Sequence, residues 1–214
     1  MSDHSLRLLA LPMAVPPAVV PRKRPRQARA AATVQAIIEA SARILEAQGL
    51  AGFNTNAVAA LAGVSIGSLY QYFPGKEAIL AALAEREAEA FDAALGAALG
   101  EIGDLGTTSA VGLLAQVAVE HQTRHPRLAR ILDLEEQRLG LTEAQAAAGR
   151  TVRAIAAFLT DRKLGGEEAA LDILHLSRGL IDGAVERGAT EGLVKRLSWA
   201  ILGYLALSRQ AQPA

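Results

Sequence analysis

Two short helical segments separated only by Gly63-Val64-Ser65 constrain the fold of this chain more than any other feature. The first segment spans about residues 56–62 and the second about residues 66–73. Glycine suits the left-handed residue that ends a helix, and a serine hydroxyl can cap the start of the next one. Two short helices at this spacing predict a helix-turn-helix.

Each short helix has one apolar side that we expect to be buried. A longer helix over about residues 27–49 precedes them, and Gly49 is expected to end it in the left-handed region. Thr55 is the expected N-cap of the first short helix. The expected buried residues are Val58, Leu61 and Ala62 on the first short helix, and Ile66, Leu69 and Phe73 on the second.

The other side of the second short helix indicates a role in nucleic-acid binding. It carries Ser68, Gln71 and Tyr72 at steps of three and four residues, and it has no carboxylate. Hydroxyl and amide groups can donate hydrogen bonds to phosphates or base edges, whereas a carboxylate would be repelled by phosphate. Gly67 costs a free helix about 1 kcal/mol relative to alanine. Its small size would let the start of this helix approach a duplex closely.

Charge is distributed unevenly along the chain, although the net charge is zero. Residues 21–78 contain seven basic and three acidic side chains, while residues 79–214 contain 14 basic and 18 acidic ones. A proline-rich segment precedes a basic arm formed by Arg22, Lys23, Arg24 and Arg26. We expect residues 1–26 to be a flexible tail whose basic part follows a phosphate backbone or enters a minor groove. The alternative is a merely solvated tail.

Residues 33–80 resemble the N-terminal DNA-binding domain of the TetR/AcrR family of bacterial transcriptional regulators. The matching motifs are residues 37–49, Phe53-Asn54-Thr55, Gly63-Val64-Ser65 and the run from Leu69 to Leu80. The resemblance implies a homodimer that binds a palindromic operator, usually as a repressor. It also implies a second helical domain that dimerises and holds a small ligand, whose binding changes the spacing of the two recognition helices.

The resemblance assigns roles to individual positions. It places Thr55 on phosphate, places Gly67, Ser68 and Gln71 near bases, and places Tyr70, Tyr72 and Lys76 on the DNA backbone. In the family a threonine and a charged residue often follow the Thr55 position, whereas Asn56 and Ala57 stand here, which removes one possible phosphate contact. From the residues alone, Ser65 can be a cap, a DNA contact or both. Tyr70 can be partly core, and Tyr72 is expected to be exposed.

The remainder of the chain also predicts helices. Apolar residues make up 51% of the sequence, but aromatic residues make up only 4%, and strand-forming residues are scarce. The absence of cysteine excludes disulfides and thiolate metal sites. We therefore expect an all-α fold of about nine helices, with a helix-turn-helix domain at residues 27–78 and a larger helical bundle at residues 79–214. The later helices are expected at about 76–98, 108–124, 127–137, 143–163, 167–187 and 191–209, with a loop at 99–109.

The last two helices are the expected dimer interface, an assignment that the resemblance implies. Gly179 and Gly183 would permit close helix approach. The alternative is that the apolar residues of these helices face the core of their own domain. The candidate interface residues are Leu174, Ile181, Val185, Leu197, Ile201 and Leu205.

A ligand pocket is expected among polar residues of the second domain. His175, Arg178 and Asp182 share one helix face, and an exposed, salt-bridged face is the alternative explanation of that pattern. His121 and His125 lie four residues apart, a spacing that can chelate a metal, but no metal or cofactor is expected. The candidate pocket residues are His121, Glu135, His175, Arg178 and Asp182.

These features together favour a cytoplasmic, DNA-binding transcriptional regulator, most readily a repressor released by a small molecule. An activator, or a regulator without an effector, is the nearest alternative. An all-helical enzyme is a remote one, because the sequence shows no Ser-His-Asp arrangement, paired-carboxylate motif or metal cluster, and we expect no catalytic residues. Partners are expected to be duplex DNA, a second copy of the chain and an unidentified effector, with no membrane.

Overall fold

The structure is a computed structural model that describes residues 28–140 and 142–211. Those residues form nine α-helices and no strand, in agreement with the expected all-α class. The helices are α1 (Ala28–Gly52), α2 (Thr55–Ala62), α3 (Ile66–Tyr72), α4 (Lys76–Ile102), α5 (Thr107–Arg124), α6 (Pro126–Leu139), α7 (Thr142–Asp161), α8 (Glu167–Glu186) and α9 (Leu193–Ala211).

Helix α4 is longer than the sequence predicted. The expected loop at 99–109 begins only after Ile102, because Leu95, Ala98 and Ile102 continue one buried stripe at steps of three and four residues. Gly103, with φ at 39°, then ends the helix. Burial of that stripe outweighs the cost of the helical glycine at Gly100.

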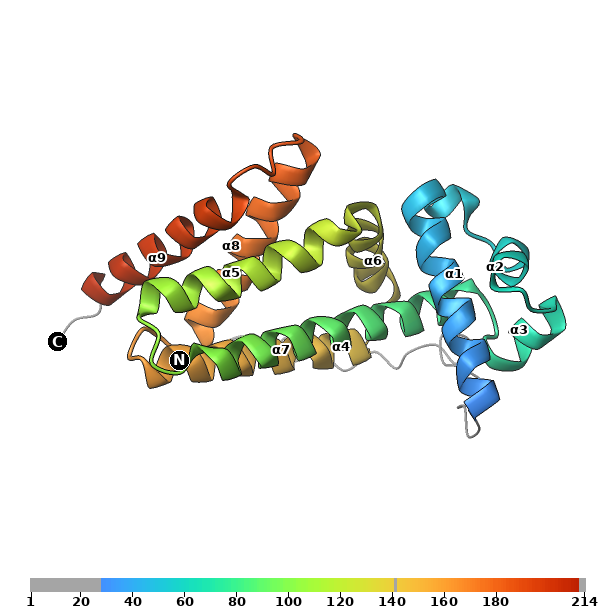
Figure 1. Ribbon diagram of the computed structural model, residues 1–214, viewed down its shortest axis with the longest axis horizontal. Coiled ribbons are helices and arrows are strands. Elements are labelled where there is room, and N and C mark those ends of the chain that lie inside the picture. Colours follow the sequence, from blue (N-terminus) through green and yellow to red (C-terminus); the bar gives the residue numbers. More distant parts are fainter. Residues whose placement is uncertain (1–27, 141, 212–214) are drawn as a thin grey trace, which may run out of the picture.

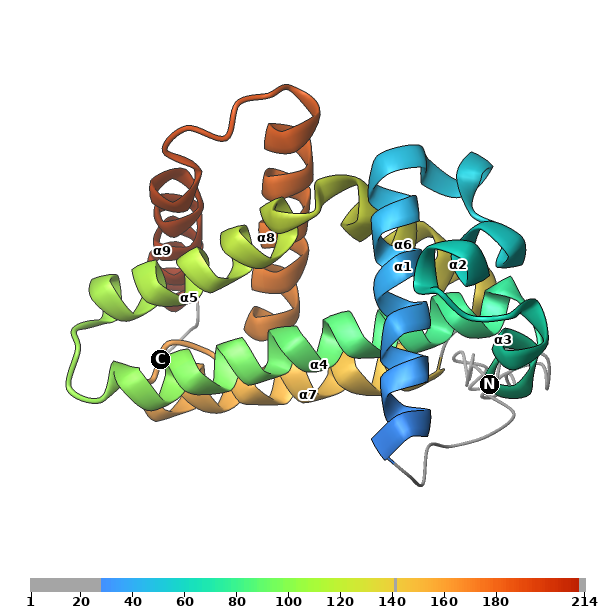
Figure 2. The ribbon, with the colours of Figure 1, turned by 45° about the vertical axis from the view of Figure 1, so that its right-hand side comes forward.

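Helix α4 connects the two ends of the molecule. Helices α1–α3 pack around its first turns at one end, and α5, α8 and α9 gather at the other (Figure 1). Helix α7 lies alongside α4, and α6 packs against α1 (Figure 2). The helix-turn-helix is therefore joined to the larger bundle by one continuous helix and by the contact between α6 and α1.

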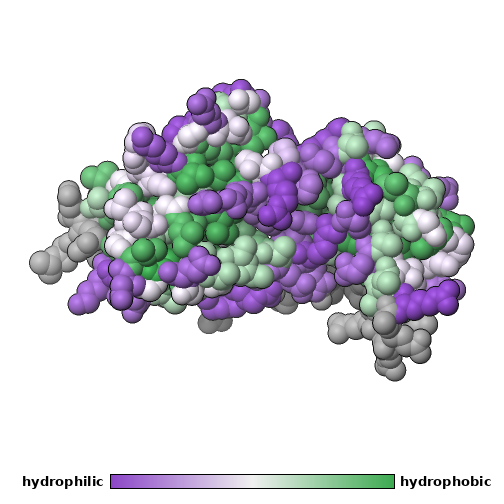
Figure 3. Space-filling model, viewed as in Figure 1, coloured by the Kyte–Doolittle hydropathy of each residue, from purple (hydrophilic) through white to green (hydrophobic). Residues whose placement is uncertain are grey.

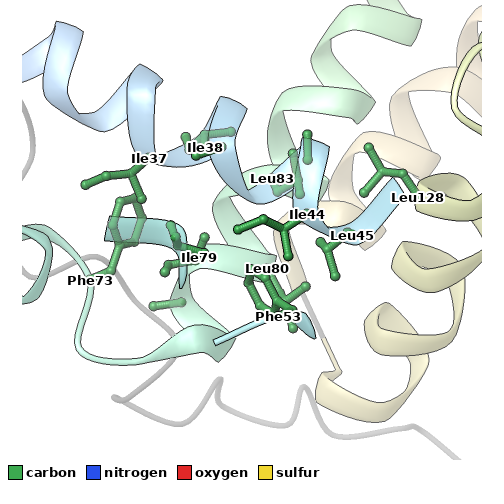
Figure 4. Close-up of a cluster of buried hydrophobic side chains, with 14 of the residues drawn as sticks. Ile37, Ile38, Ile44, Leu45, Phe53, Phe73, Ile79, Leu80, Leu83 and Leu128 are labelled. Carbon is green, nitrogen blue, oxygen red and sulfur yellow. The ribbon is translucent and has the colours of Figure 1, made fainter. Parts of the chain in front are cut away.

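The N-terminal core is built from α1–α4 and is closed by α6. Ile37 and Leu45 of α1, Phe73 after α3, and Leu83 of α4 are fully or nearly fully buried there, and Leu128 of α6 packs beside them (Figure 4). Burying each such side chain contributes about 1.5–3 kcal/mol. This core continues past residue 78 along α4 and takes in Leu128 from the bundle, so the two predicted domains share packed side chains.

A second core holds α5, α7, α8 and α9 together with the far half of α4. Figure 3 shows hydrophobic surface over this half of the molecule and hydrophilic residues across the middle. Within the described part of the chain, no helix combines the length and apolar character needed to cross a membrane.

Candidate DNA-binding surface and ligand cavity

Local hydrogen bonds fix the ends of α2 and α3. Asn54, not the expected Thr55, caps α2, because its Oδ1 accepts from the backbone N of Ala57 at 2.9 Å. Ser65 caps α3 as expected, with its Oγ accepting from the backbone N of Ser68 at 3.0 Å. Gly63 has φ at 68° and supplies the left-handed turn between the helices. The orientation of α3 relative to α2 is thus fixed by contacts within residues 54–68.

The inner and outer faces of α3 divide almost as predicted. Leu69 and Phe73 are buried on the inner side. Ile66, expected to be core, is instead 39% exposed and is the first residue of α3. Leu61 of α2 is also 50% exposed, and Ala59 is buried in its place next to Val58.

The outer face of α3 presents small and neutral groups to solvent. Gly67 and Gln71 are exposed, and Ser68 is half-buried. A Cβ placed on Gly67 would approach only Ser65 Oγ, at 3.8 Å, so the protein itself leaves room for a larger residue there. Between Asn54 and Lys76 the chain has no acidic residue, which keeps this face free of negative charge.

The two tyrosines of α3 differ from the sequence-based expectation in how far their side chains are buried. Tyr70 is 41% exposed, and its hydroxyl lies 3.2 Å from Thr55 Oγ1, which links the start of α2 to α3. Tyr72, expected to be exposed, is half-buried and packs against the N-terminal core. Asn56 and Lys76 are exposed near the first turns of α2 and α4. The predicted DNA-facing residues other than those of the basic arm therefore lie on α2, α3 and the adjoining turns.

The basic arm formed by Arg22, Lys23, Arg24 and Arg26 lies outside the described residues. Its expected role on the DNA backbone stays a prediction.

A cavity of about 300 Å³ lies between α4, α5, α6, α7 and α8. Three of the five predicted pocket residues, His121, His175 and Arg178, line it. Sequence reasoning missed its aromatic and aliphatic walls, because these come from five helices and no single helix periodicity reveals them. The apolar lining consists of Ala84, Ala88, Phe91, Ala118, Leu128, Ala129, Leu132, Val152, Leu171 and Leu174.

The prediction for Glu135 and Asp182 needs correction. Glu135 is buried and pairs with Arg138 at 2.5 Å, and it is not among the residues that line the cavity. Asp182 does not line the cavity, although it accepts from Gln122 Nε2, a lining residue, at 3.3 Å.

Polar groups from α5, α6 and α8 form one wall of the cavity. Arg178 pairs with Asp133 at 3.0 Å, and Gln122 Nε2 donates to Asp133 Oδ2 at 3.5 Å. Burial raises the pKa of Asp133, which Arg178 opposes. Burial, with the charge of Asp133, also raises the pKa of Glu136. Burial lowers the pKa of His121, whose ring lies 5.0 Å from that of Phe91, so the imidazole is neutral at pH 7.

Most of the predicted dimer residues belong to the core of their own protomer. Ile181, Leu197, Ile201 and Leu205 are buried in the second core, and Val185 packs against it. Leu174 packs there too and lines the cavity. The apolar periodicity of α8 and α9 is explained by packing within one chain. The large apolar residues left exposed on α9 are Trp199, at 61%, and Leu207, at 67%.

Helix α6 connects the cavity to the helix-turn-helix. Its first turn has no side-chain cap of its own, and Glu46 Oε2 of α1 accepts from the backbone N of Leu128 at 2.8 Å. Arg127 Nη1 donates to the carbonyl of Ala47 at 3.0 Å. Gly49 lies directly beneath this guanidinium, with φ at 69°, and a Cβ there would come within 2.5 Å of Arg127 Nη2. The start of α6 therefore packs closely against α1 at its kink, Gly49.

Comparisons with known proteins agree with this arrangement. Residues 37–83 match the family of "Bacterial regulatory proteins, tetR family". The HTH-type transcriptional repressor DrrR1 of Streptomyces coeruleorubidus is 30% identical over 99 residues, which are 46% of this chain and 35% of that repressor. The chain therefore matches about a third of the length of this relative.

Solved structures extend the likeness to the whole fold. The fatty acid degradation regulator FadR from Bacillus halodurans superimposes with a TM-score of 0.66 at 18% identity, over 85% of this chain and 97% of that one. SmeT, in its complex with triclosan, gives a TM-score of 0.59 at 21% identity, over 83% and 91% of the two chains. Residues 37–83 therefore carry the motif of the tetR family of bacterial regulatory proteins, and the described helices share the overall fold of these solved structures.

Proposed function

We propose that this protein is a dimeric transcriptional regulator that binds a two-fold operator through α3, most readily as a repressor released by a small ligand. The observation that carries the proposal is the outer face of α3. It is held rigidly by Ser65 and Gly63, is free of carboxylates, and offers Gly67 and Gln71 to a partner. Such a helix fits the major groove.

Individual contacts follow from the chemistry of that face. Gln71 can make paired hydrogen bonds to an adenine, and Ile66 offers an exposed methyl surface to a thymine methyl group. Tyr70 and Thr55, already linked to each other, can hold a phosphate together, and the Lys76 ammonium can reach the same backbone. Ser65, Ser68, Asn56 and Tyr72 surround these groups, and the arm from Arg22 to Arg26 would add salt-dependent affinity.

Dimerisation is proposed through the outer sides of α8 and α9. Trp199, Gly203 and Leu207 are exposed and spaced four residues apart along α9, so they form one continuous strip. Lys195 Nζ lies 4.8 Å from the centroid of the Trp199 ring. On α8, a Cβ at Gly179 would meet no atom of the same chain, so a partner helix can come close there.

The cavity is proposed as the effector site, and α6 as the route by which an effector acts on DNA binding. Leu128, Ala129, Leu132, Asp133 and Glu136 of α6 line the cavity. The same helix is capped by Glu46 of α1. A ligand that displaces α6 would therefore move α1 and the helix-turn-helix with it. The triclosan complex of SmeT, a structural neighbour, is consistent with a small-molecule site in this fold.

The experiment is selection of genomic fragments with the purified full-length chain, followed by footprinting and sedimentation of the complex. We expect one recurring palindrome, protected over two half-sites by one dimer. A footprint overlapping the promoter elements would support repression, and one upstream of them would favour activation. Recovery of unrelated fragments, or binding as a monomer to an asymmetric site, would contradict the proposal.

A further inference from the structure

The geometry points to a lipophilic amine as the effector class of this cavity, with its ammonium group beside Glu136 and its apolar body among Phe91, Leu128 and Leu174. This inference rests on the proposal that the cavity is the effector site. It is carried by the pairing of the charged groups around the cavity, taken one by one.

Two of the three cavity-lining carboxylates already have a cationic partner. Glu87 pairs with Arg86 at 2.5 Å, and Asp133 pairs with Arg178 at 3.0 Å. Glu136 follows Asp133 by one turn of α6 and is half-buried, and no hydrogen bond or ion pair within the described residues reaches its carboxylate. The positive charge of Arg178 also acts on Glu136, so Asp133 and Glu136 share one cation and this part of the cavity keeps an excess of negative charge.

The basic groups of the cavity do not provide an equivalent site for an anion. Arg178 pairs with Asp133 and also attracts Glu136, and burial lowers the pKa of His121, which favours its neutral form. Arg124, His125 and His175 are exposed, so water screens their interaction with a bound ligand. A carboxylate of a ligand would add a further negative charge beside Asp133 and Glu136, and burial of like charges is unfavourable.

A ligand ammonium would remove this imbalance. It would form a charge-assisted hydrogen bond to Glu136, which is stronger than a bond between neutral groups. Burial raises the pKa of Glu136, and a cation beside the carboxylate would oppose that shift and stabilise its charged form. The remaining cavity surface is mainly aliphatic and aromatic, and a volume of about 300 Å³ admits one ring with a short chain.

The test uses three molecules with the same tail and different head groups: 4-phenylbutylamine, 4-phenylbutan-1-ol and 4-phenylbutanoate. Binding to the full-length chain is measured by calorimetry at pH 7, without DNA. We expect the amine to bind at least about tenfold more tightly than the alcohol, which corresponds to about 1.4 kcal/mol, and the carboxylate to bind most weakly.

Two variants separate the role of Glu136 from a general effect of charge. Glu136→Gln should weaken the amine about tenfold and leave the alcohol nearly unchanged. It should not lower the thermal midpoint of the free protein, since it removes a half-buried charge that Asp133 repels. Glu120→Gln is the matched control, because Glu120 is exposed on α5, bonds to Gln116 and does not line the cavity. It should leave all three affinities unchanged.

The outcomes separate the proposed effector class from the proposal that the cavity is a ligand site. Preference for the carboxylate, or an amine affinity that Glu136→Gln does not change, would overturn the effector class and leave the cavity as a ligand site. Failure of all three molecules to bind at millimolar concentration would overturn both. Operator binding, measured separately, tests the DNA-binding role whatever the calorimetry shows.

Discussion

The proposed DNA-binding surface and the proposed effector cavity are built in opposite ways. The surface on α2 and α3 is fixed by neighbours in sequence, such as Asn54 with Ala57 and Ser65 with Ser68. The cavity draws its lining from five helices, α4 to α8. The difference teaches that a short motif can carry a transferable binding surface. A cavity instead depends on how long helices happen to pack, so it can change its ligand without changing the fold.

The largest effect should come from placing a large side chain at Gly67, where α3 is proposed to approach DNA most closely. Gly67→Leu should abolish specific DNA binding, because the leucine side chain would clash with the base edges in the major groove. The fold should be unaffected, because a Cβ at this position meets only Ser65 Oγ, at 3.8 Å. We expect at least about a hundredfold loss in affinity for the operator, or about 2.7 kcal/mol. Gel shift and thermal unfolding would measure the two effects.

Gly96→Leu is the control for that change, since Gly96 is exposed on α4 and a Cβ there meets no neighbour. Retained operator affinity in Gly67→Leu would show that the groove does not come close at this residue.

Breaking the dimer should also weaken DNA binding severely. Trp199→Asp places a charge in the exposed apolar strip of α9, and burial of an unpaired charge costs several kcal/mol. We expect monomers by sedimentation and loss of cooperative two-site protection. An unchanged dimer in Trp199→Asp would move the interface elsewhere.

A smaller and more selective effect is expected at Gln71. Gln71→Ala should cost about 1–3 kcal/mol and relax the preference at one operator position in each half-site. Binding to a set of single-base operator variants would measure it. An equal loss on every variant would reassign Gln71 to the DNA backbone.

The contact between α1 and α6, which joins the α2–α3 surface to the cavity, can be weakened by a substitution outside both. Glu46→Gln should weaken the bond to the amide of Leu128 and destabilise the start of α6 by about 1 kcal/mol. Operator affinity should change little, whereas effector-induced release should need a higher effector concentration. Release at an unchanged concentration would show that α6 is not the route.

The smallest effect concerns pH. Burial lowers the pKa of His121 in the folded chain, so the stability it contributes is present above its unfolded value of 6.5 and is lost as pH falls through the folded value. The free energy of unfolding should therefore fall less in His121→Gln than in the parent chain when the pH drops from 7.5 to 5.5. Parallel pH profiles would contradict this assignment.

The same contrast explains how much the sequence could foretell. Gly63, Ser65 and the buried Leu69 act locally, so the helix-turn-helix and its outward Gln71 could be predicted from spacing alone. Ile66 and Tyr72 exchanged their expected degree of burial, because the way α3 packs on the N-terminal core decides it and periodicity within one short helix does not. Helical periodicity also marked the apolar face of α9 correctly, but it does not say whether that face meets its own core or a second chain.

The cavity shows the limit most clearly. His121, His175 and Arg178 were identifiable as polar residues on apolar helices, and all three line it. Glu136, which carries the proposed ligand specificity, has no distinguishing sequence context. Its lack of a partner emerges only once Arg178 is seen to pair with Asp133.

The most direct test of the account is a competition experiment with the purified full-length chain on a labelled operator at fixed low salt. Unlabelled operator should displace the label at concentrations about a thousandfold or more below those of a random duplex of equal length. Equal displacement by both duplexes would mean that the outer face of α3 reads no sequence, and the central claim would fail.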